Sequence, residues 1–146
     1  MLQEDGRISY ATLGRRLNIP LSTVHDKVRR LTEDGVIKSV AAILDEKAVG
    51  FNSTVVMGVE TGAKHYVSVA DVLRGFDEVV EVYGTTAEFD LMVKIQAKNR
   101  EEMREIINRI RSLDGVDDIY VFSVLEVFKD VPMRPVAKNK SVKRLG

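Results

Sequence analysis

Residues 83–90, YGTTAEFD, place hydroxyl groups, carboxylates and a glycine backbone close together. Carboxylates can bind the ammonium of a small zwitterion such as an amino acid, and N–H and hydroxyl groups can bind its carboxylate. The residues alone favour a polar hairpin turn, with an effector-binding site as the alternative. The candidate effector-binding residues are Tyr83, Gly84, Thr85, Thr86, Glu88 and Asp90.

A second candidate is the basic helix predicted at residues 22–34. Val24, Val28 and Leu31 recur at helical spacing and form an inward stripe, and Gly35 supplies a stop. In helix-turn-helix units the second helix contacts base edges in the major groove, and arginines reach phosphates or guanine. A merely solvated polar face is the alternative. The outward side of this helix carries Ser22, Thr23, Asp26, Arg29 and Arg30, with His25 on its flank.

Catalytic and metal chemistry have few candidate residues. The absence of cysteine excludes a disulfide scaffold, a thiolate metal site and a cysteine nucleophile. The two histidines, His25 and His65, are too few for a metal centre built from imidazoles. No nucleophile or phosphate loop accompanies the paired carboxylates of the polar segment. We therefore expect no catalytic residues, no metal and no cofactor.

Two short helices position the basic stretch. Ser9 can cap a helix over residues 10–17, and Ser22 offers the N-cap of the next helix across a tight turn. Residues 36–44 are apolar and rich in β-branched side chains, which predicts a strand. Asp45 can cap one helical turn that ends the first domain.

The second half of the chain repeats itself. Leu73 and Leu113 lie forty residues apart in corresponding positions, and the intervening pattern is strand, helix, strand, twice over. This pattern predicts an α+β chain, with a ferredoxin-like βαββαβ domain after the helix-turn-helix. The predicted strands are residues 53–60, 78–85, 89–96 and 116–128, and the predicted helices are 64–74 and 100–112.

The strands carry more apolar residues than a single helix-covered face can bury. A second copy of the sheet is the economical cover for the other face, so we predict a homodimer. The residues on which this prediction depends are Val80, Val82, Leu91, Val93, Ile119, Val121 and Val127.

Charge is unevenly distributed although the total is zero, from 22 Lys plus Arg and 22 Asp plus Glu. Residues 7–30 hold six basic residues and one acidic residue, a net of +5, and residues 45–130 hold ten basic and seventeen acidic, a net of −7. The tail from residue 131 adds five basic residues and no acidic one. Many soluble proteins carry such clusters, and a basic segment beside an acidic domain also suits a polyanion such as double-stranded DNA.

These patterns divide the chain into a helix-turn-helix domain with a linker strand at 1–50, an effector-binding and oligomerisation domain at 51–130 and a basic tail at 131–146. We interpret the tail as an extra DNA contact. No apolar run approaches the roughly 20 residues of a membrane helix, and no signal peptide opens the chain, so we expect a cytoplasmic location and no membrane partner.

Several blocks, in this order and spacing, resemble the Lrp/AsnC (feast/famine) family of transcription regulators. The blocks are residues 2–10 (LQEDGRISY), 13–17 (LGRRL), 22–31 (STVHDKVRRL), 35–38 (GVIK), 44–45 (LD), 50–51 (GF), 80–83 (VEVY) and 88–91 (EFDL). The resemblance implies a sequence-specific regulator whose DNA binding responds to a small molecule, typically an amino acid, and dimers that assemble further into octamers. It also implies which side chains of the recognition helix face DNA, namely Ser22, Thr23, His25, Asp26, Arg29 and Arg30. It further implies that the effector binds near Tyr83, Gly84, Thr85, Thr86, Glu88 and Asp90.

The resemblance further implies a helix before Leu2, so the given sequence is expected to be truncated or to start late, and Leu13 and Val28 are expected to lose packing. Ala87 stands where family members commonly carry glycine. Two alternatives stay open. One is a decarboxylase of the haem pathway with this two-domain fold, and the other is an effector-binding module with a vestigial first domain.

Overall fold

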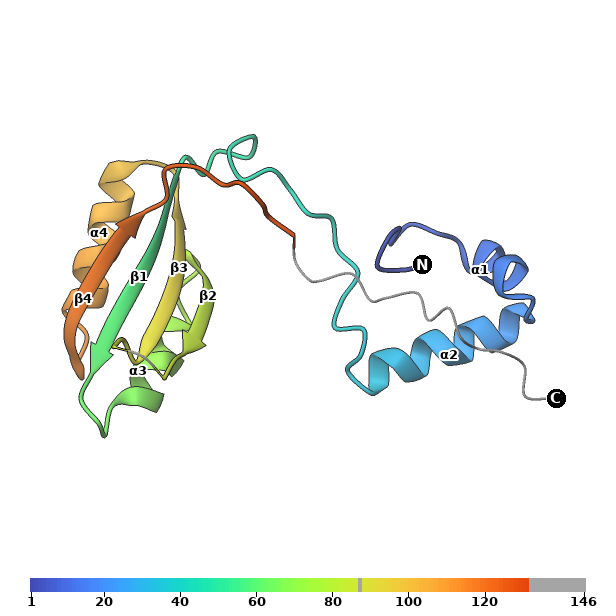
Figure 1. Ribbon diagram of the computed structural model, residues 1–146, viewed down its shortest axis with the longest axis horizontal. Helices are drawn as coiled ribbons and strands as arrows, with labels where there is room; N and C mark the ends of the chain where they lie inside the picture. The colour runs from blue at the N-terminus through green and yellow to red at the C-terminus, as the bar shows by residue number, and fades with distance from the viewer. Residues whose placement is uncertain (87, 132–146) are drawn as a thin grey trace. The chain divides into compact units, whose positions relative to one another are not determined.

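The computed structural model describes residues 1–86 and 88–131. Met1–Ile43 belongs to one compact unit and Leu44–Lys129 forms another (Figure 1). Ala87 and all but the first residue of the predicted basic tail lie outside the described residues.

Two helices form the first unit. The α1 helix, Tyr10–Leu17, has the predicted bounds, and the predicted cap is confirmed because the Ser9 hydroxyl accepts the Thr12 N–H at 3.1 Å. Asn18 ends this helix in the left-handed region, with φ of 54°, a conformation that asparagine tolerates. This residue turns the chain sharply into the next helix.

The α2 helix, Leu21–Glu33, begins two residues earlier than a cap at Ser22 requires. The carbonyl of Pro20 already accepts the Val24 N–H at 3.1 Å, so Pro20 is the N-cap residue and the predicted cap at Ser22 is wrong. The predicted stop is confirmed, since the helix ends before Gly35, whose φ is +70°.

The predicted strand at residues 36–44 is wrong. This segment has no regular secondary structure, and Val36, Val40 and Ile43 are 70%, 63% and 75% exposed. A strand needs a hydrogen-bonded neighbour, and no described segment pairs with this one. Asp45 opens a turn, as expected, by accepting the Ala48 N–H through its side chain at 2.9 Å.

The second unit is a four-stranded antiparallel sheet with two helices on one face. The strand order is β2-β3-β1-β4, which is the ferredoxin-like arrangement (Figure 1). The elements are β1 Ser53–Thr61, α3 Tyr66–Leu73, β2 Val79–Gly84, β3 Leu91–Ala97, α4 Arg100–Arg111 and β4 Val116–Ser123. The βαββαβ prediction is confirmed, although α3 is shorter than expected and β4 ends five residues before residue 128.

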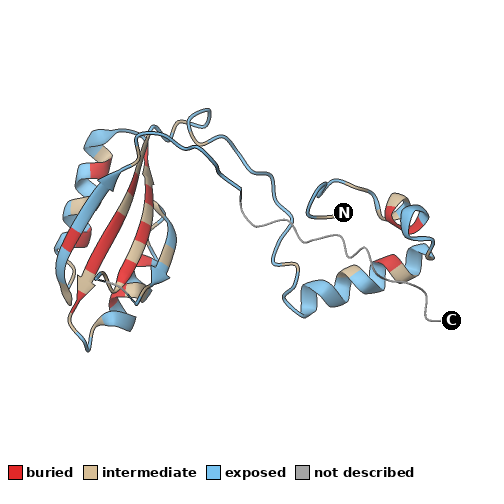
Figure 2. Cartoon of the chain, viewed as in Figure 1, coloured by how far each residue is buried: buried red, intermediate tan, exposed pale blue. Residues whose placement is uncertain are grey.

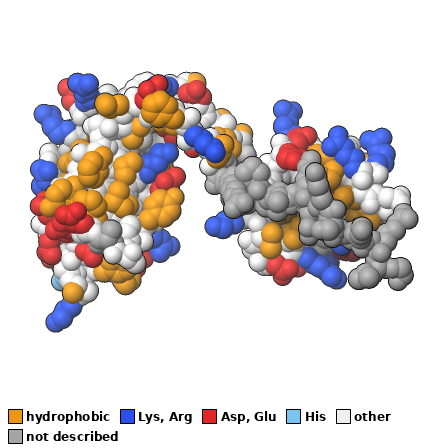
Figure 3. Space-filling view, in the orientation of Figure 1, with side chains coloured by type: hydrophobic (Ala, Val, Ile, Leu, Met, Phe, Trp, Pro, Cys, Tyr) orange, Lys and Arg blue, Asp and Glu red, His pale blue; other side chains and the backbone are white. Residues whose placement is uncertain are grey.

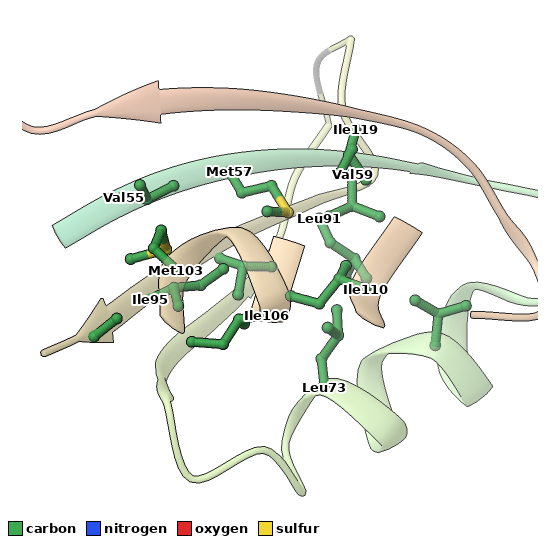
Figure 4. Close-up of a cluster of buried hydrophobic side chains, with 13 residues drawn as sticks. Val55, Met57, Val59, Leu73, Leu91, Ile95, Met103, Ile106, Ile110 and Ile119 are labelled. Carbon is green, nitrogen blue, oxygen red and sulfur yellow. The ribbon is translucent and has the colours of Figure 1, made fainter. Parts of the chain in front are cut away.

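The core lies between the sheet and the helices (Figure 4). Alternate residues of β1 and β3 point into it, as the strand period requires, and α4 contributes its inward stripe. The buried residues of this unit lie on the strands and on the sides of the helices that face the sheet (Figure 2). The core residues are Val55, Met57, Val59, Val69, Leu73, Leu91, Val93, Ile95, Ala97, Met103, Ile106, Ile110 and Ile119.

The opposite face of the sheet has no helix over it, and Figure 3 shows hydrophobic side chains gathered over the strands of this unit. Most of the seven apolar residues counted from the sequence lie on the core side of the sheet, and Val80 is 46% exposed at a register shift in β2. Leu91, Val93 and Ile119 are buried in the core, and Val82 packs against it. Val121 pairs with the core residue Met57, and Val127 lies beyond β4. The strand registers give an open face made of Thr54, Val56, Gly58, Glu60, Glu81, Tyr83, Met92, Lys94, Gln96, Asp118, Tyr120 and Phe122.

Candidate functional site

The contact between α1 and α2 orients the predicted recognition helix. Leu13 on α1 is 4% exposed and Val24 on α2 is 2% exposed. A Cβ at Gly14 would lie 2.9 Å from the Ile19 carbonyl oxygen and 3.6 Å from a Val24 methyl, so glycine permits the close approach of the two helices. The apolar side of α2 is thereby fixed inward, and its polar side is turned to solvent.

Five of the six residues predicted to face DNA lie on that exposed side. Thr23 is half-buried, and the others are exposed. The exposed set therefore contains a short hydroxyl side chain near the start of α2 and two arginines in its second half. The five are Ser22, His25, Asp26, Arg29 and Arg30.

Arg29 lies between two acidic side chains of its own helix. Its guanidinium donates to Asp26 Oδ1 at 3.1 Å and lies 4.0 Å from Glu33 Oε1. All three side chains are more than 60% exposed, so water screens both pairs and each stabilises the helix only weakly. The guanidinium is held along the helix surface in the free protein and remains available to another anion.

His25 has an aromatic neighbour on the other helix. Its ring meets Tyr10 edge to face, with centroids 4.6 Å apart and planes at 77°. Tyr10 is half-buried at the start of α1, so it restricts the rotamers of the exposed imidazole. Among the described residues, no group of His, Asp and Glu side chains could hold a metal ion.

An apolar hollow of about 290 Å³ opens between the two helices. Val28 is half-buried beside it, and Leu13 is only 4% exposed although it also borders the hollow. The lining residues are Met1, Leu2, Leu13, Leu17, Ile19, Val24, Lys27, Val28, Leu31 and Ile37.

The predicted effector segment is a short loop between β2 and β3, closed by its own hydrogen bonds. The Thr85 N–H donates to the Asp90 carbonyl at 2.9 Å, and the Thr85 hydroxyl donates to the carbonyl of Phe89. Asp90 Oδ2 accepts both the Thr61 N–H at 2.7 Å and the Thr61 hydroxyl at 3.1 Å. Two of the six predicted effector residues, Thr85 and Asp90, are therefore engaged in shaping the loop.

The other four described residues of this set, Tyr83, Gly84, Thr86 and Glu88, are exposed. A hydrogen bond from Tyr83 to Glu81, together with the negative charge of that carboxylate, raises the pKa of the Tyr83 hydroxyl. The exposed part of the loop thus offers one backbone segment without a side chain, two hydroxyls and one carboxylate.

Phe89 connects this loop to the open face. A Cβ at Gly58 would lie 2.6 Å from the Phe89 ring, so the ring packs directly on the glycine backbone. The same ring lies 4.9 Å from that of Tyr120 and 6.2 Å from that of Phe122, measured between centroids. Loop and sheet face therefore share one aromatic side chain.

Acidic groups surround this aromatic cluster. The negative charges of Glu60 and Asp118 raise the pKa of the Tyr120 hydroxyl, and Glu88 acts in the same direction. The end of the open face nearest the loop is therefore a region of negative potential, which favours cationic groups such as an ammonium.

Three residues near the loop were missed by sequence reasoning. Thr61 binds Asp90, Tyr66 lies against Gly84, and Phe89 packs on Gly58. The last two contacts have a sequence signal, a glycine within or at the end of a strand, which often marks the close approach of another group. The partner of each glycine could be identified only once the topology was known.

Comparison with known proteins agrees with both halves of the structure. Residues 54–133 match the model of the Lrp/AsnC ligand-binding domain, and residues 1–38 match a winged helix-turn-helix DNA-binding model. The transcriptional regulator FL11 of Pyrococcus furiosus is 35% identical over 93% of this chain and 90% of its own length. Ptr1 of Methanocaldococcus jannaschii, also a transcriptional regulator, is 31% identical over 93% of each chain.

Solved structures share the fold. E. coli AsnC is similar with a TM-score of 0.81 and 25% identity, over 92% of this chain and 90% of that one. A regulator from Neisseria meningitidis, solved in complex with L-methionine, has a TM-score of 0.82 and 23% identity over 92% and 89% of the two chains.

In the described part of the chain, no helix is long and apolar enough to cross a membrane. The relatives are named as regulators, and the haem-pathway decarboxylase considered from the sequence finds no support among them. Family models matched over both units, and regulators at 31–35% identity over nearly the full length, show that the chain belongs to the Lrp/AsnC family of transcriptional regulators, a family without enzymatic activity.

Proposed function

We propose that this protein binds specific DNA sequences as a homodimer and that an amino acid modulates this binding. The observation that carries the proposal is the exposed basic side of α2. Arg29 and Arg30 face solvent there, while Val24 holds the opposite side against α1. Basic side chains on a rigidly held helix can neutralise phosphates and reach base edges together.

Ser22, Thr23, His25 and Asp26 are the proposed base-edge and positioning contacts, because they lie in the N-terminal half of α2. Thr23 is half-buried, so it would contact DNA through whichever of its own methyl and hydroxyl groups lies nearer the surface. The arginines in the second half are the proposed phosphate contacts.

DNA binding is tested by fluorescence anisotropy with an operator fragment from footprinting and a scrambled fragment of equal length. Binding by two basic heads predicts a steep salt dependence, because each neutralised phosphate releases counterions and contributes about −0.9 to the slope of log K against log salt. Equal affinity for both fragments would contradict sequence-specific recognition.

The open face supports the proposed dimer. Tyr83, Tyr120 and Phe122 are 56%, 39% and 49% exposed, and such a concentration of aromatic surface on a sheet calls for a covering partner. The cation on this face, Lys94, is paired with Glu46 at 3.4 Å, so burial would not leave this charge unpaired. A second copy offers the same surface around a two-fold axis.

Sedimentation of the full chain at micromolar concentration tests the dimer. A single species of monomer mass would contradict it. We further propose that dimers assemble into octamers, as the resemblance to the family implies, which the same measurement detects as a heavier species.

The exposed loop residues Tyr83, Gly84, Thr86 and Glu88 are the proposed contacts of the effector, with Thr85 and Asp90 holding the loop in shape. Two structures of this fold were solved with L-methionine, which supports an amino acid as the ligand class. A thermal-shift screen of the twenty amino acids tests this. A melting temperature that none of them raises would contradict the proposal.

A protein that binds chromosomal DNA works where that DNA is found. We therefore propose a cytoplasmic location, which fractionation of cells expressing the protein would test.

A further inference from the structure

The described part of the effector loop offers few free side-chain hydrogen-bond donors. The carboxylate of an amino acid needs N–H or O–H donors, preferably more than one. The Thr85 hydroxyl, one of the two threonine hydroxyls in this loop, is already donated to the Phe89 carbonyl. Of the loop's threonines, Thr86 is left, and its neighbour Glu88 is a carboxylate that would repel the carboxylate of the ligand.

Tyr66 brings a further hydroxyl to the same place from outside the loop. It is the first residue of α3 and is 39% exposed. A Cβ on Gly84 would collide with the Tyr66 hydroxyl and lie 3.2 Å from its Cζ, so the phenol rests on the backbone of Gly84. Within the part of the chain that the structure describes, this hydroxyl has no hydrogen-bond partner.

Gly84 is required by this approach rather than by its backbone conformation. Its φ is not in the positive region, where glycine is favoured; among the described glycines, Gly35, Gly50 and Gly115 occupy that region. Any side chain at position 84 would push the phenol away from the loop. The glycine thus places an unengaged donor beside a candidate ligand-binding backbone.

We propose that Tyr66 belongs to the effector site and donates its hydroxyl to the carboxylate of the bound amino acid. The inference rests on the proposed effector function and adds a residue from a different element of the fold. The ammonium of the same ligand is assigned to the acidic end of the site, where Glu88 is exposed.

The test uses the full-length protein, its Tyr66→Phe variant and the amino acid that most raises the melting temperature of the wild type. Isothermal titration is expected to show binding at least tenfold weaker in Tyr66→Phe, since the variant loses a hydrogen bond to a charged group. Tyr10→Phe is the matched control, because Tyr10 also opens a helix, α1, and it is expected to bind like the wild type.

A second ligand assigns the contact to the carboxylate. This second ligand is the amine that corresponds to the chosen amino acid, with the same side chain but no carboxyl group. It is expected to bind the wild type and Tyr66→Phe with equal affinity. A tenfold difference that persists with the amine would overturn the carboxylate assignment. Equal binding of the amino acid itself to both proteins would overturn the role of Tyr66 while leaving the effector function intact, whereas no binding to the wild type would overturn both.

A ligand-independent experiment checks the geometry. Gly84→Ala is expected to lower the melting temperature, because the new methyl collides with the phenol of Tyr66. Adding Tyr66→Phe removes the colliding oxygen and leaves the Cζ at 3.2 Å, a contact relieved by a shift of a few tenths of an ångström. The double variant is therefore expected to regain the melting temperature of Tyr66→Phe. Failure of this rescue would overturn the contact on which the proposal depends.

Discussion

Arg29→Ala should weaken operator binding without unfolding the protein. The guanidinium is proposed to contact one phosphate in each half of a symmetric complex, so the dimer loses two contacts. Each contact contributes about −0.9 to the slope of log K against log salt, and the slope should therefore become less steep by about 1.8. At 0.1 M salt the corresponding loss of affinity is roughly 60-fold.

The free protein should tolerate this change. The pairs of Arg29 with Asp26 and Glu33 are exposed, and exposed pairs of this kind stabilise a helix by about 0.3–0.5 kcal/mol each. The two acidic side chains stay on the helix after the substitution and would add repulsion against the phosphates. The measured loss of affinity should therefore match or exceed the value from counterion release alone.

Anisotropy titrations between 50 and 300 mM salt measure the slope, and thermal melting measures stability. Arg74→Ala is a matched control, because Arg74 is also exposed and pairs with an aspartate three residues earlier, Asp71 at 2.9 Å, but lies in the other unit. An unchanged salt slope in Arg29→Ala, or an equal change in the control, would refute the phosphate contact.

Three further outcomes are expected. Asp90→Ala should destabilise the fold by about 1–3 kcal/mol, because two donors of the buried Thr61 lose their acceptor, and a melting curve that matches the wild type would contradict this. Phe89→Ala should raise the dimer dissociation constant roughly tenfold, through the loss of aromatic contacts in both copies, and sedimentation at decreasing concentration measures it. Glu60→Gln should lower the raised pKa of Tyr120, because the negative charge of Glu60 favours the neutral phenol. In the wild type, the stability linked to this raised pKa is fully present below the ordinary tyrosine pKa. That stability is lost as pH rises through the raised pKa of Tyr120. Ultraviolet titration of phenolate formation checks the shift, with Tyr120→Phe identifying the signal.

The sequence predicted local features best. The Ser9 cap and the bounds of α1 depend on a few adjacent residues, and both are right. The cap at Ser22 failed by two positions because Pro20 already provides the first helical carbonyl, a detail of backbone geometry rather than of composition. The strand at 36–44 failed for a different reason, since β-propensity cannot supply the neighbouring strand that would complete its hydrogen bonds.

The open face shows what an apolar pattern leaves undetermined. The surplus of apolar strand residues indicated a second apolar face, but without the register the sequence could not tell which residues lie on it, and Leu91 and Val93 lie in the core. A shift of one residue exchanges the two faces of a strand, so the faces could be assigned only from the pairing. The contact between Tyr66 and Gly84 was equally out of reach, because it joins a helix to a strand end eighteen positions later in the chain.

The closure of the β2–β3 loop by Thr85 and Asp90 has a consequence for the positions around them. Thr85 and Asp90 hold the loop in shape by hydrogen bonds to Phe89 and Thr61. The outward-pointing side chains around them are therefore not needed for the loop conformation. Substitutions at the surface of the loop can then accumulate without loss of folding, and each new combination presents a different chemical surface to metabolites. A combinatorial library restricted to those outward positions should keep the melting temperature of the wild type while it varies the ligand affinity of the proposed effector site.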